Sequence, residues 1–128
     1  MAGPRSTVPD PFRRRAHGRG KTAESIAVWR LRLAGYRILA RRYACPAGEI
    51  DIVARRLSRL AVVEVKARAS IATAAEAITP RQWRRIARAA EHFLAGRPAL
   101  AALDLTFDVV LIAPWRWPRH LPDAWRPA

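Results

Sequence analysis

The stretch GEIDIVARRLSRLAVVEVKAR, residues 48–68, decides the fold because it has the pattern of two short strands joined by a basic turn. Ile, Val and Ala fill most positions on both sides of the turn, as in strands that pack against a core. Asp51, Glu64 and Lys66 interrupt this apolar pattern. Three ionisable side chains in a sheet that a small domain should bury are either a surface ion pair or a functional site.

The spacing of these three residues along the two strands allows their side chains to meet on one face of the hairpin. Alternate residues of a strand share a face, so Asp51 lies on the face of Glu49, and Glu64 lies on the face of Lys66. If the turn pairs Asp51 with Glu64 or with Lys66, opposed Cβ atoms lie about 5 Å apart. Both carboxylates could then bind one cation, with Glu49 at the edge of the site.

Glu24 is a fourth ionisable residue that departs from the expected burial pattern. Residues 22–34 are predicted to form a helix, and Glu24 lies on its apolar face. A carboxylate directed at the core is costly unless a metal ion or a cationic partner compensates for its lost hydration. We therefore expect Glu24 to converge with the hairpin residues where this helix crosses the hairpin.

The other elements complete an α/β domain. Alternation over residues 36–42 predicts a strand, and residues 104–113, apolar at both parities, predict a strand covered on both faces. Thr79 and Gln82 have capping-box spacing before an apolar stripe, which predicts a helix that ends at Gly96. The expected order is helix, three strands, helix, strand (αβββαβ), with a mixed central sheet flanked by helices.

The two ends of the chain differ in composition from this core. Residues 1–19 are rich in Pro and Arg and are expected to form a flexible basic arm. Residues 20–113 are expected to form the folded domain. Residues 114–128 alternate Pro, Trp and Arg, so this tail is expected to be irregular, although its tryptophans could pack back on the domain.

The net charge favours a polyanionic partner. The 128 residues include 24 Lys and Arg against 10 Asp and Glu, for a formal charge of +14, and nearly all the positive charge is arginine. Nucleic acid is the first expectation and an anionic membrane surface the second, although a GC-rich genome would also enrich arginine. The single cysteine, Cys45, is compatible with a reducing cytosol, and no apolar run approaches the roughly 18 residues of a membrane span. We expect a cytoplasmic protein without a membrane segment.

The candidate site has the composition of a magnesium site. Hard oxygen ligands without a His or Cys cluster favour Mg²⁺, or Mn²⁺, over zinc. Asp51 and Glu64 would hold the ion and Lys66 would orient or deprotonate a water, which predicts phosphodiester hydrolysis. Arginines of the hairpin and of the second helix would hold the nucleic-acid backbone: Arg55, Arg56, Arg59, Arg68, Arg81, Arg84, Arg85 and Arg88.

Each of these residues also has a structural interpretation. Glu64 and Lys66 could be an ordinary ion pair on a solvated sheet face, and Asp51 could be a cross-strand partner of Lys66. Glu24 could stabilise the first turn of its helix. The arginines of the second helix could equally form a solvated face, and Gln82 is explained by capping. The joint placement of the acids favours a site.

Six segments of the chain together resemble the YraN family of small bacterial proteins, which is similar to Holliday-junction resolvases with the restriction-endonuclease-like fold. The segments are GKTAES, GYRILARR, GEIDIVA, VVEVKAR, AITPRQWRRIARAAEHFL and FDVVLI, and the C-terminal HLPDAW is also similar. The resemblance implies a D…E-x-K nuclease site. Asp51 and Glu64 would be its metal carboxylates, Lys66 its catalytic lysine and Glu24 an additional acid.

The sequence departs from the family pattern at three places. The family usually has a lysine at the position of Gln82, an asparagine at the position of Arg42, and Arg-Phe-Asp where Thr106-Phe107-Asp108 stands. These departures weaken the case for auxiliary phosphate contacts. They do not affect the four expected site residues, Glu24, Asp51, Glu64 and Lys66.

The sequence therefore predicts a magnesium-dependent nuclease that acts on DNA, with branched or damaged DNA as candidate substrates. DNA is expected ahead of RNA, and two copies could pair as a homodimer to cut two strands. The alternative is a non-catalytic nucleic-acid-binding protein that keeps the nuclease fold. A third reading is a basic adaptor whose Trp-rich tail recruits a protein partner.

Overall fold

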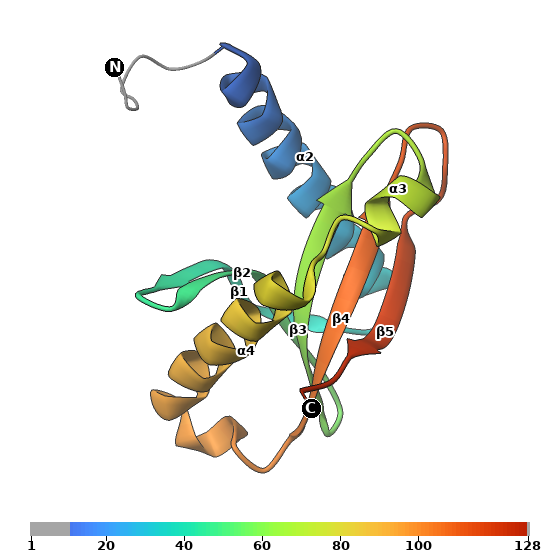
Figure 1. The fold of residues 1–128 in the computed structure, drawn as a ribbon. Coiled ribbons are helices and arrows are strands. Elements are labelled where there is room, and N and C mark those ends of the chain that lie inside the picture. The colour runs from blue at the N-terminus through green and yellow to red at the C-terminus, as the bar shows by residue number, and fades with distance from the viewer. Residues whose placement is uncertain (1–10, 128) are drawn as a thin grey trace.

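A computed structural model describes the backbone of residues 11–127 and the side chains of residues 22–127. The elements in chain order are α2 (Pro11–Leu33), β1 (Arg37–Cys45), β2 (Gly48–Arg56), β3 (Arg59–Ala67), α3 (Ile71–Ala75), α4 (Pro80–Ala95), the 3₁₀ turn η1 (Pro98–Leu100), β4 (Asp104–Ile112) and β5 (Arg119–Trp125). Helices α2 and α4 lie on opposite sides of the sheet (Figure 1). None of the described helices is both long and apolar enough to cross a membrane.

The five strands form one mixed sheet in the order β1-β2-β3-β4-β5. Strands β3 and β4 are parallel, and the other neighbouring pairs are antiparallel. The predicted mixed α/β sheet is confirmed, with α3 and β5 as additions to the predicted order. Because β3 and β4 are parallel, the loops that follow them emerge at the same end of the sheet.

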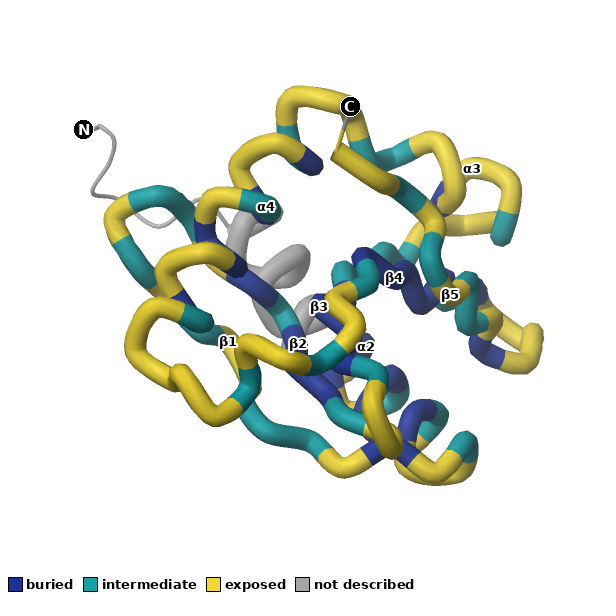
Figure 2. Tube along the Cα trace, turned by 90° about the horizontal axis from the view of Figure 1, so that it is seen from below, coloured by how far each residue is buried: buried dark blue, intermediate teal, exposed yellow. Residues whose placement is uncertain are grey.

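Two apolar clusters cover the two faces of the central strands. Val62, Phe107 and Phe93 belong to the cluster on the α4 side, and Val63 and Val110 belong to the cluster on the α2 side. Figure 2 shows the buried positions concentrated along β2, β3 and β4. Burial on both faces explains why these strands are apolar at both parities.

Helix α4 begins and ends as the sequence predicts. Thr79 accepts a hydrogen bond from the Gln82 N–H, and the Gln82 side chain accepts one from the Thr79 N–H, which completes a capping box. Pro80 occupies the first turn, and Gly96 follows the last residue. The buried stripe consists of Trp83, Ile86, Ala89, Ala90 and Phe93.

Helix α2 is longer than the sequence predicts. It begins at Pro11 instead of residue 22, so residues 11–19 of the predicted arm lie in the helix, and residues 1–10 lie outside the described residues. Pro11 stands at the first helical position, where a missing N–H costs nothing. The arginines that suggested an arm are also good helix formers.

Strand β5 replaces most of the irregular tail that the sequence predicts. It pairs antiparallel with β4 and covers an edge that would otherwise expose unpaired backbone groups. The pairing is irregular between Phe107 and Val109, which accommodates Pro122 in a strand at the sheet edge. Trp125 stacks on Trp83 of α4 with ring centroids 5.5 Å apart, so one tail tryptophan does pack on the domain.

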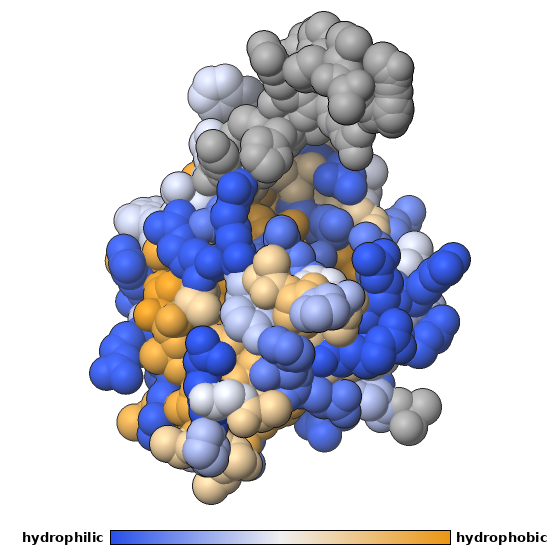
Figure 3. Space-filling view, turned by 90° about the vertical axis from the view of Figure 1, so that its left-hand side faces the viewer, coloured by the Kyte–Doolittle hydropathy of each residue, from blue (hydrophilic) through white to orange (hydrophobic). Residues whose placement is uncertain are grey.

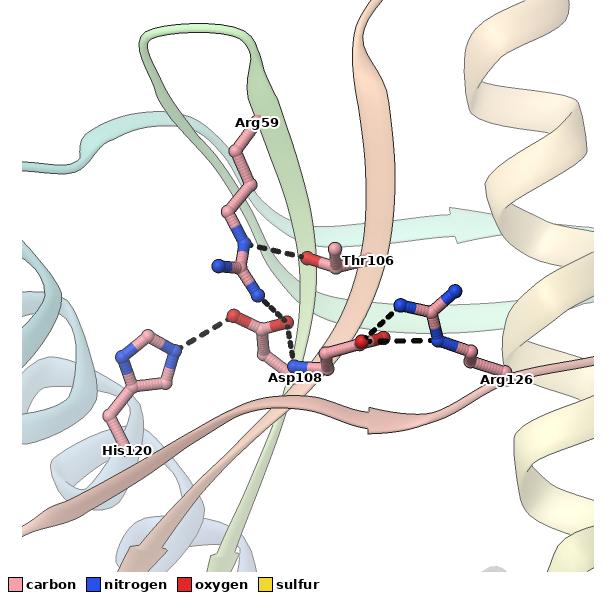
Figure 4. A network of polar contacts seen from close by, with 6 residues as sticks. Arg59, Thr106, Asp108, His120 and Arg126 are labelled. Carbon is pink, nitrogen blue, oxygen red and sulfur yellow. Dashed lines mark hydrogen bonds and ion pairs between the residues drawn. The ribbon is translucent and has the colours of Figure 1, made fainter.

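A buried carboxylate connects β5 to the rest of the sheet (Figure 4). Asp108 is fully buried; its Oδ2 lies 2.8 Å from Nε2 of His120, and its Oδ1 accepts a hydrogen bond from the Asp123 N–H at 3.0 Å. Arg59 lies 3.8 Å from Oδ1 and also donates to Thr106. Burial by itself would raise the pKa of Asp108, but the hydrogen bonds from His120, Asp123 and Thr106 lower it below its ordinary value.

We expect Asp108→Asn to lower the free energy of unfolding at pH 7 by about 3 kcal/mol, because it removes a buried charge from several donors. A lowered folded-state pKa stabilises the protein above the ordinary value of 3.8, and this stabilisation is lost as the pH falls below it. The difference between wild type and variant in urea denaturation should therefore shrink below pH 3.8. Asp104→Asn, at an exposed position of the same strand, is the control and should change stability little.

Candidate active site

Asp51 lies close to Glu64 and Val65, just beyond the paired part of the β2–β3 hairpin. Ile52 pairs with Val63 and Val53 with Val62, and Asp51 and Glu64 are the next residues after the last of these pairs. Asp51 Oδ2 accepts a hydrogen bond of 2.8 Å from the backbone N–H of Val65, which ties the carboxylate to β3. The side chains of Asp51 and Glu64 are also within hydrogen-bonding distance of each other.

Lys66 lies on the same face of β3 as Glu64 and forms an ion pair with it. Its Nζ lies 3.8 Å from Oε2 of Glu64, and the exposed fractions of the two side chains are 16% and 12%. Burial raises the pKa of Glu64 to about 9, and its hydrogen bond to Asp51 and the negative charge of Asp51 add to this increase. Lys66 opposes the increase without overcoming it. The acid pair therefore lacks positive charge, and it holds a proton in the absence of a cation.

A small hollow opens beside Glu64 toward α4. It has a volume of about 140 Å³ and is lined by Gly48, Glu49, Glu64, Gln82, Arg85 and Ile86. Glu49, which the sequence predicts at the edge of the site, lines this hollow together with Glu64. Gln82 caps α4 and also lines this hollow beside Glu49 and Glu64. Arg85 is the positively charged residue of the lining.

Glu24 does not take the place that the sequence predicts for it. Its carboxylate is buried on α2 and binds Arg41 and Arg42 of β1, each through Nε at 2.7 Å. The cationic partner that a buried carboxylate requires is thus a pair of arginines. The sequence offered a clue in two consecutive arginines on the strand after the helix, but it did not indicate that they turn toward Glu24.

Arg42 adopts the left-handed conformation, with φ of 53°. This conformation is uncommon for residues other than glycine, and asparagine is among those that tolerate it best. The asparagine expected here from the family resemblance would suit the backbone, whereas Arg42 adds an ion pair with Glu24. This departure from the family pattern therefore has a structural explanation.

Asp51 and Glu64 are the carboxylates available for a cation. In the part of the chain that the structure describes, no three His, Cys, Asp or Glu side chains gather closely enough to hold a metal ion. Mg²⁺ is commonly bound through one or two carboxylates and several waters, so a pair of acids is compatible with it. The raised pKa of Glu64 is compatible with such an ion, because a bound cation would favour the charged carboxylate that burial and the neighbouring Asp51 disfavour.

The eight arginines predicted to bind nucleic acid divide into two groups. Arg81, Arg84, Arg85 and Arg88 are exposed on α4, and Arg68 is exposed after β3. Figure 3, which views the side toward which the β1–β2 hairpin projects, shows hydrophilic residues over much of the surface. These five arginines remain candidates for phosphate contacts.

The other three arginines lie near the β2–β3 turn, at the opposite end of β3 from Lys66, and contact the protein itself. Arg55 donates to the Leu57 carbonyl, and Arg56 donates to the Ala34 carbonyl and lies over the Tyr36 ring. Arg59 contacts Asp108 and Thr106. These contacts account for the three side chains without a ligand.

Comparison with known proteins identifies relatives along most of the chain. Residues 23–112 match the profile described as "Uncharacterised protein family UPF0102". The UPF0102 protein of Parvibaculum lavamentivorans is 62% identical over 112 residues, which cover 88% of this chain and 84% of the relative. UPF0102 protein amb4503 of Paramagnetospirillum magneticum is 52% identical over 125 residues (94% and 97%), and the UPF0102 protein of Methylorubrum extorquens is 52% identical over 116 residues (91% of each).

The raised pKa of Glu64 predicts a stability that falls with increasing pH. The folded protein binds this proton more tightly than the unfolded chain, so without a divalent cation the free energy of unfolding should decrease from about pH 4.5 to about pH 9. The slope for one proton is at most about 1.4 kcal/mol per pH unit. Mg²⁺ or Mn²⁺ should stabilise the protein most at the alkaline end of this range.

Glu64→Gln is the matched variant for this measurement, because it keeps the shape of the side chain and has no titrating group. Urea denaturation at several pH values, in EDTA and in Mg²⁺, should show a flatter pH dependence and a smaller response to the cation. An unchanged slope in Glu64→Gln would show that the pH dependence arises elsewhere.

Proposed function

The chain belongs to the family UPF0102, and we propose that it is a divalent-cation-dependent nuclease that hydrolyses phosphodiester bonds of DNA. The observation that carries the proposal is the meeting of Asp51, Glu64 and Lys66 on one face of the β2–β3 hairpin. A protein that only binds nucleic acid gains nothing from two carboxylates placed together near phosphates. The restriction-endonuclease-like fold implied by the family resemblance is part of the same proposal.

In this mechanism Asp51 and Glu64 would hold the cation, and the Val65 N–H keeps Asp51 in place. When bound, Mg²⁺ or Mn²⁺ would supply positive charge to a phosphate oxygen and make a bound water more acidic. Lys66 keeps its ammonium group 3.8 Å from Glu64, where it offsets negative charge and can position the attacking water. Partial burial of the two side chains strengthens these electrostatic effects.

The exposed face of α4 would hold the DNA backbone beside these residues. Arg85 lines the hollow next to Glu64, and Arg84 and Arg88 are exposed on the same helix. Guanidinium groups bind phosphate in a bidentate manner, and the formal charge of +14 favours approach of a polyanion. The backbone contact is independent of sequence, so it brings DNA to the site without selecting a base.

Cleavage of a DNA panel tests the catalytic part of this proposal. We expect purified protein with Mg²⁺ or Mn²⁺ to cut at least one of supercoiled, single-stranded and four-way-junction DNA. Asp51→Asn should reduce the rate at least about 100-fold and keep or tighten binding, because a charge that repels phosphate is removed. Glu91→Gln, at an exposed position of α4, is the control and should keep the wild-type rate.

Two other outcomes of the panel are informative. Binding of all three DNAs without cleavage in either cation would contradict the nuclease and favour the non-catalytic binding protein. Loss of binding together with cleavage in Asp51→Asn would assign Asp51 a structural role.

The salt dependence of DNA binding tests the proposed role of α4. Each phosphate contact contributes about 0.9 to the slope of log K against log salt concentration. The double variant Arg84→Ala/Arg88→Ala should therefore lower the slope measured by fluorescence anisotropy by up to about 2. Arg32→Ala removes an exposed arginine from α2, on the other side of the sheet, and should leave the slope unchanged; equal effects of both variants would place the DNA elsewhere.

A further inference from the structure

An apolar cavity lies at the end of the sheet where β3 and β4 finish, on the side of α2. Its volume of about 1090 Å³ is slightly above the usual range for small-molecule sites, roughly 300–1,000 Å³. Its lining includes Ile26, Trp29, Ala67, Arg68, Ile112 and Arg116. A second cavity of about 620 Å³ shares Ala69, Ala113, Pro114 and Arg116 with it. The β4–β5 loop therefore stands between two hollows.

Trp115 occupies an unusual position in this loop. Its side chain is 101% exposed, and its backbone adopts the left-handed conformation with φ of 61°. Backbone conformations of this kind in residues other than glycine occur preferentially at ligand sites and switches. Full exposure of a tryptophan gains nothing for folding, so the side chain is available for a ligand.

Two contacts made by residues just after Trp115 attach the loop to α2. Trp117 packs edge-on against Trp29 of α2, with ring centroids 5.1 Å apart. Arg30 of α2 donates a hydrogen bond of 3.1 Å to the Pro118 carbonyl. The exposed tryptophan is thus presented by a loop that is attached to the domain.

The cavity lies close to the proposed catalytic lysine. Lys66 is opposite Leu111 in the parallel β3–β4 pair, and Ala67 is opposite Ile112. Because alternate residues of a strand face opposite sides, Lys66 faces α4 whereas Ala67 lines the cavity on the α2 side. Trp115 follows three residues after Ile112, a span of at most about 10 Å. A strand of DNA that crosses this end of the sheet could contact both sides.

The charge around the cavities matches a nucleic acid. The residues of the described chain that line the two cavities include Arg68, Arg116 and Arg119, and no Asp or Glu is among them. Figure 1 shows the loops after β3 and β4 at the same end of the sheet. An aromatic ring beside arginines is the combination with which proteins bind unpaired bases, the ring by stacking and the guanidinium groups by contact with phosphate.

We propose that Trp115 and the cavity beside it hold an unpaired nucleobase, so that the DNA bound by this protein carries unpaired nucleotides next to the site of cleavage. The proposal specifies the substrate class of the proposed nuclease and rests on that function for its ligand. A fully paired duplex would have to unpair and extrude a base to occupy the site, which lowers its affinity.

Binding in EDTA, where cleavage does not interfere, tests the proposal with the full chain. The probes are a fluorescein-labelled duplex and the same duplex with a short single-stranded gap that carries 2-aminopurine. We expect tighter binding of the gapped DNA and quenching of 2-aminopurine by stacking. Trp115→Ala should weaken binding of the gapped DNA roughly 5- to 100-fold, abolish the quenching and leave duplex binding unchanged. Trp115→Phe should retain most of both effects.

Leu57→Ala is the matched control. Leu57 is 86% exposed with φ of 54°, so it resembles Trp115 in exposure and backbone, but it lies in the turn at the other end of β3. Equal losses for both DNAs, or no loss in Trp115→Ala, would overturn the proposal. A fall in sedimentation mass in Trp115→Ala would also overturn it, because the surface would then hold a second copy of the chain.

The cleavage panel separates this proposal from the nuclease. If the protein binds gapped DNA more tightly than duplex through Trp115 but cuts no DNA, the proposed nuclease activity is wrong and the base-binding site is supported. If Trp115→Ala cuts DNA and prefers gapped DNA as strongly as the wild type does, the base-binding site is wrong and the nuclease activity is supported.

Discussion

The register of the β2–β3 hairpin is the constraint on which the rest of the site depends. A shift of one residue in either strand would move Asp51 or Glu64 to the other face of the sheet. The register is held because β2 and β3 are buried on both sides, so a slip would exchange residues between two packed layers. Packing of the whole domain therefore brings together two acidic side chains whose charged forms repel each other.

The same two-sided burial determines how much of the structure can be predicted from the sequence. The central strands and α4 are predictable because their patterns report local physics: apolar runs with polar turns, and a capping box before an apolar stripe. Strand β5 is not predictable in this way, because its pairing depends on an edge of β4 and on distant side chains such as Asp108 and Trp83. Pro122 and the tail composition conceal a strand that tertiary contacts stabilise.

Glu24 shows the limit of reasoning from burial alone. The sequence correctly indicates that this carboxylate faces inward and needs positive charge, and burial of Glu24 confirms the first half of that inference. Which cation satisfies it depends on the path of β1, where Arg41 and Arg42 both reach α2. That path includes a register shift in β1 and a left-handed residue, neither of which the sequence pattern indicates. A buried acid therefore predicts a partner more reliably than it predicts the identity of that partner.

Two buried carboxylates in the same sheet illustrate the difference between a completed polar network and an incomplete one. Asp108 is surrounded by His120, Arg59 and a backbone N–H, and its pKa is lowered in spite of burial. Glu64 lies beside the carboxylate of Asp51, its ammonium partner Lys66 is 3.8 Å away, and its pKa is raised. A domain with so many arginines could supply a guanidinium to Glu64 as it does to Asp108 and Glu24. Without a guanidinium among its described contacts, Glu64 leaves the acid pair short of positive charge beside the hollow that opens toward α4, and either a bound proton or the proposed cation would balance the pair.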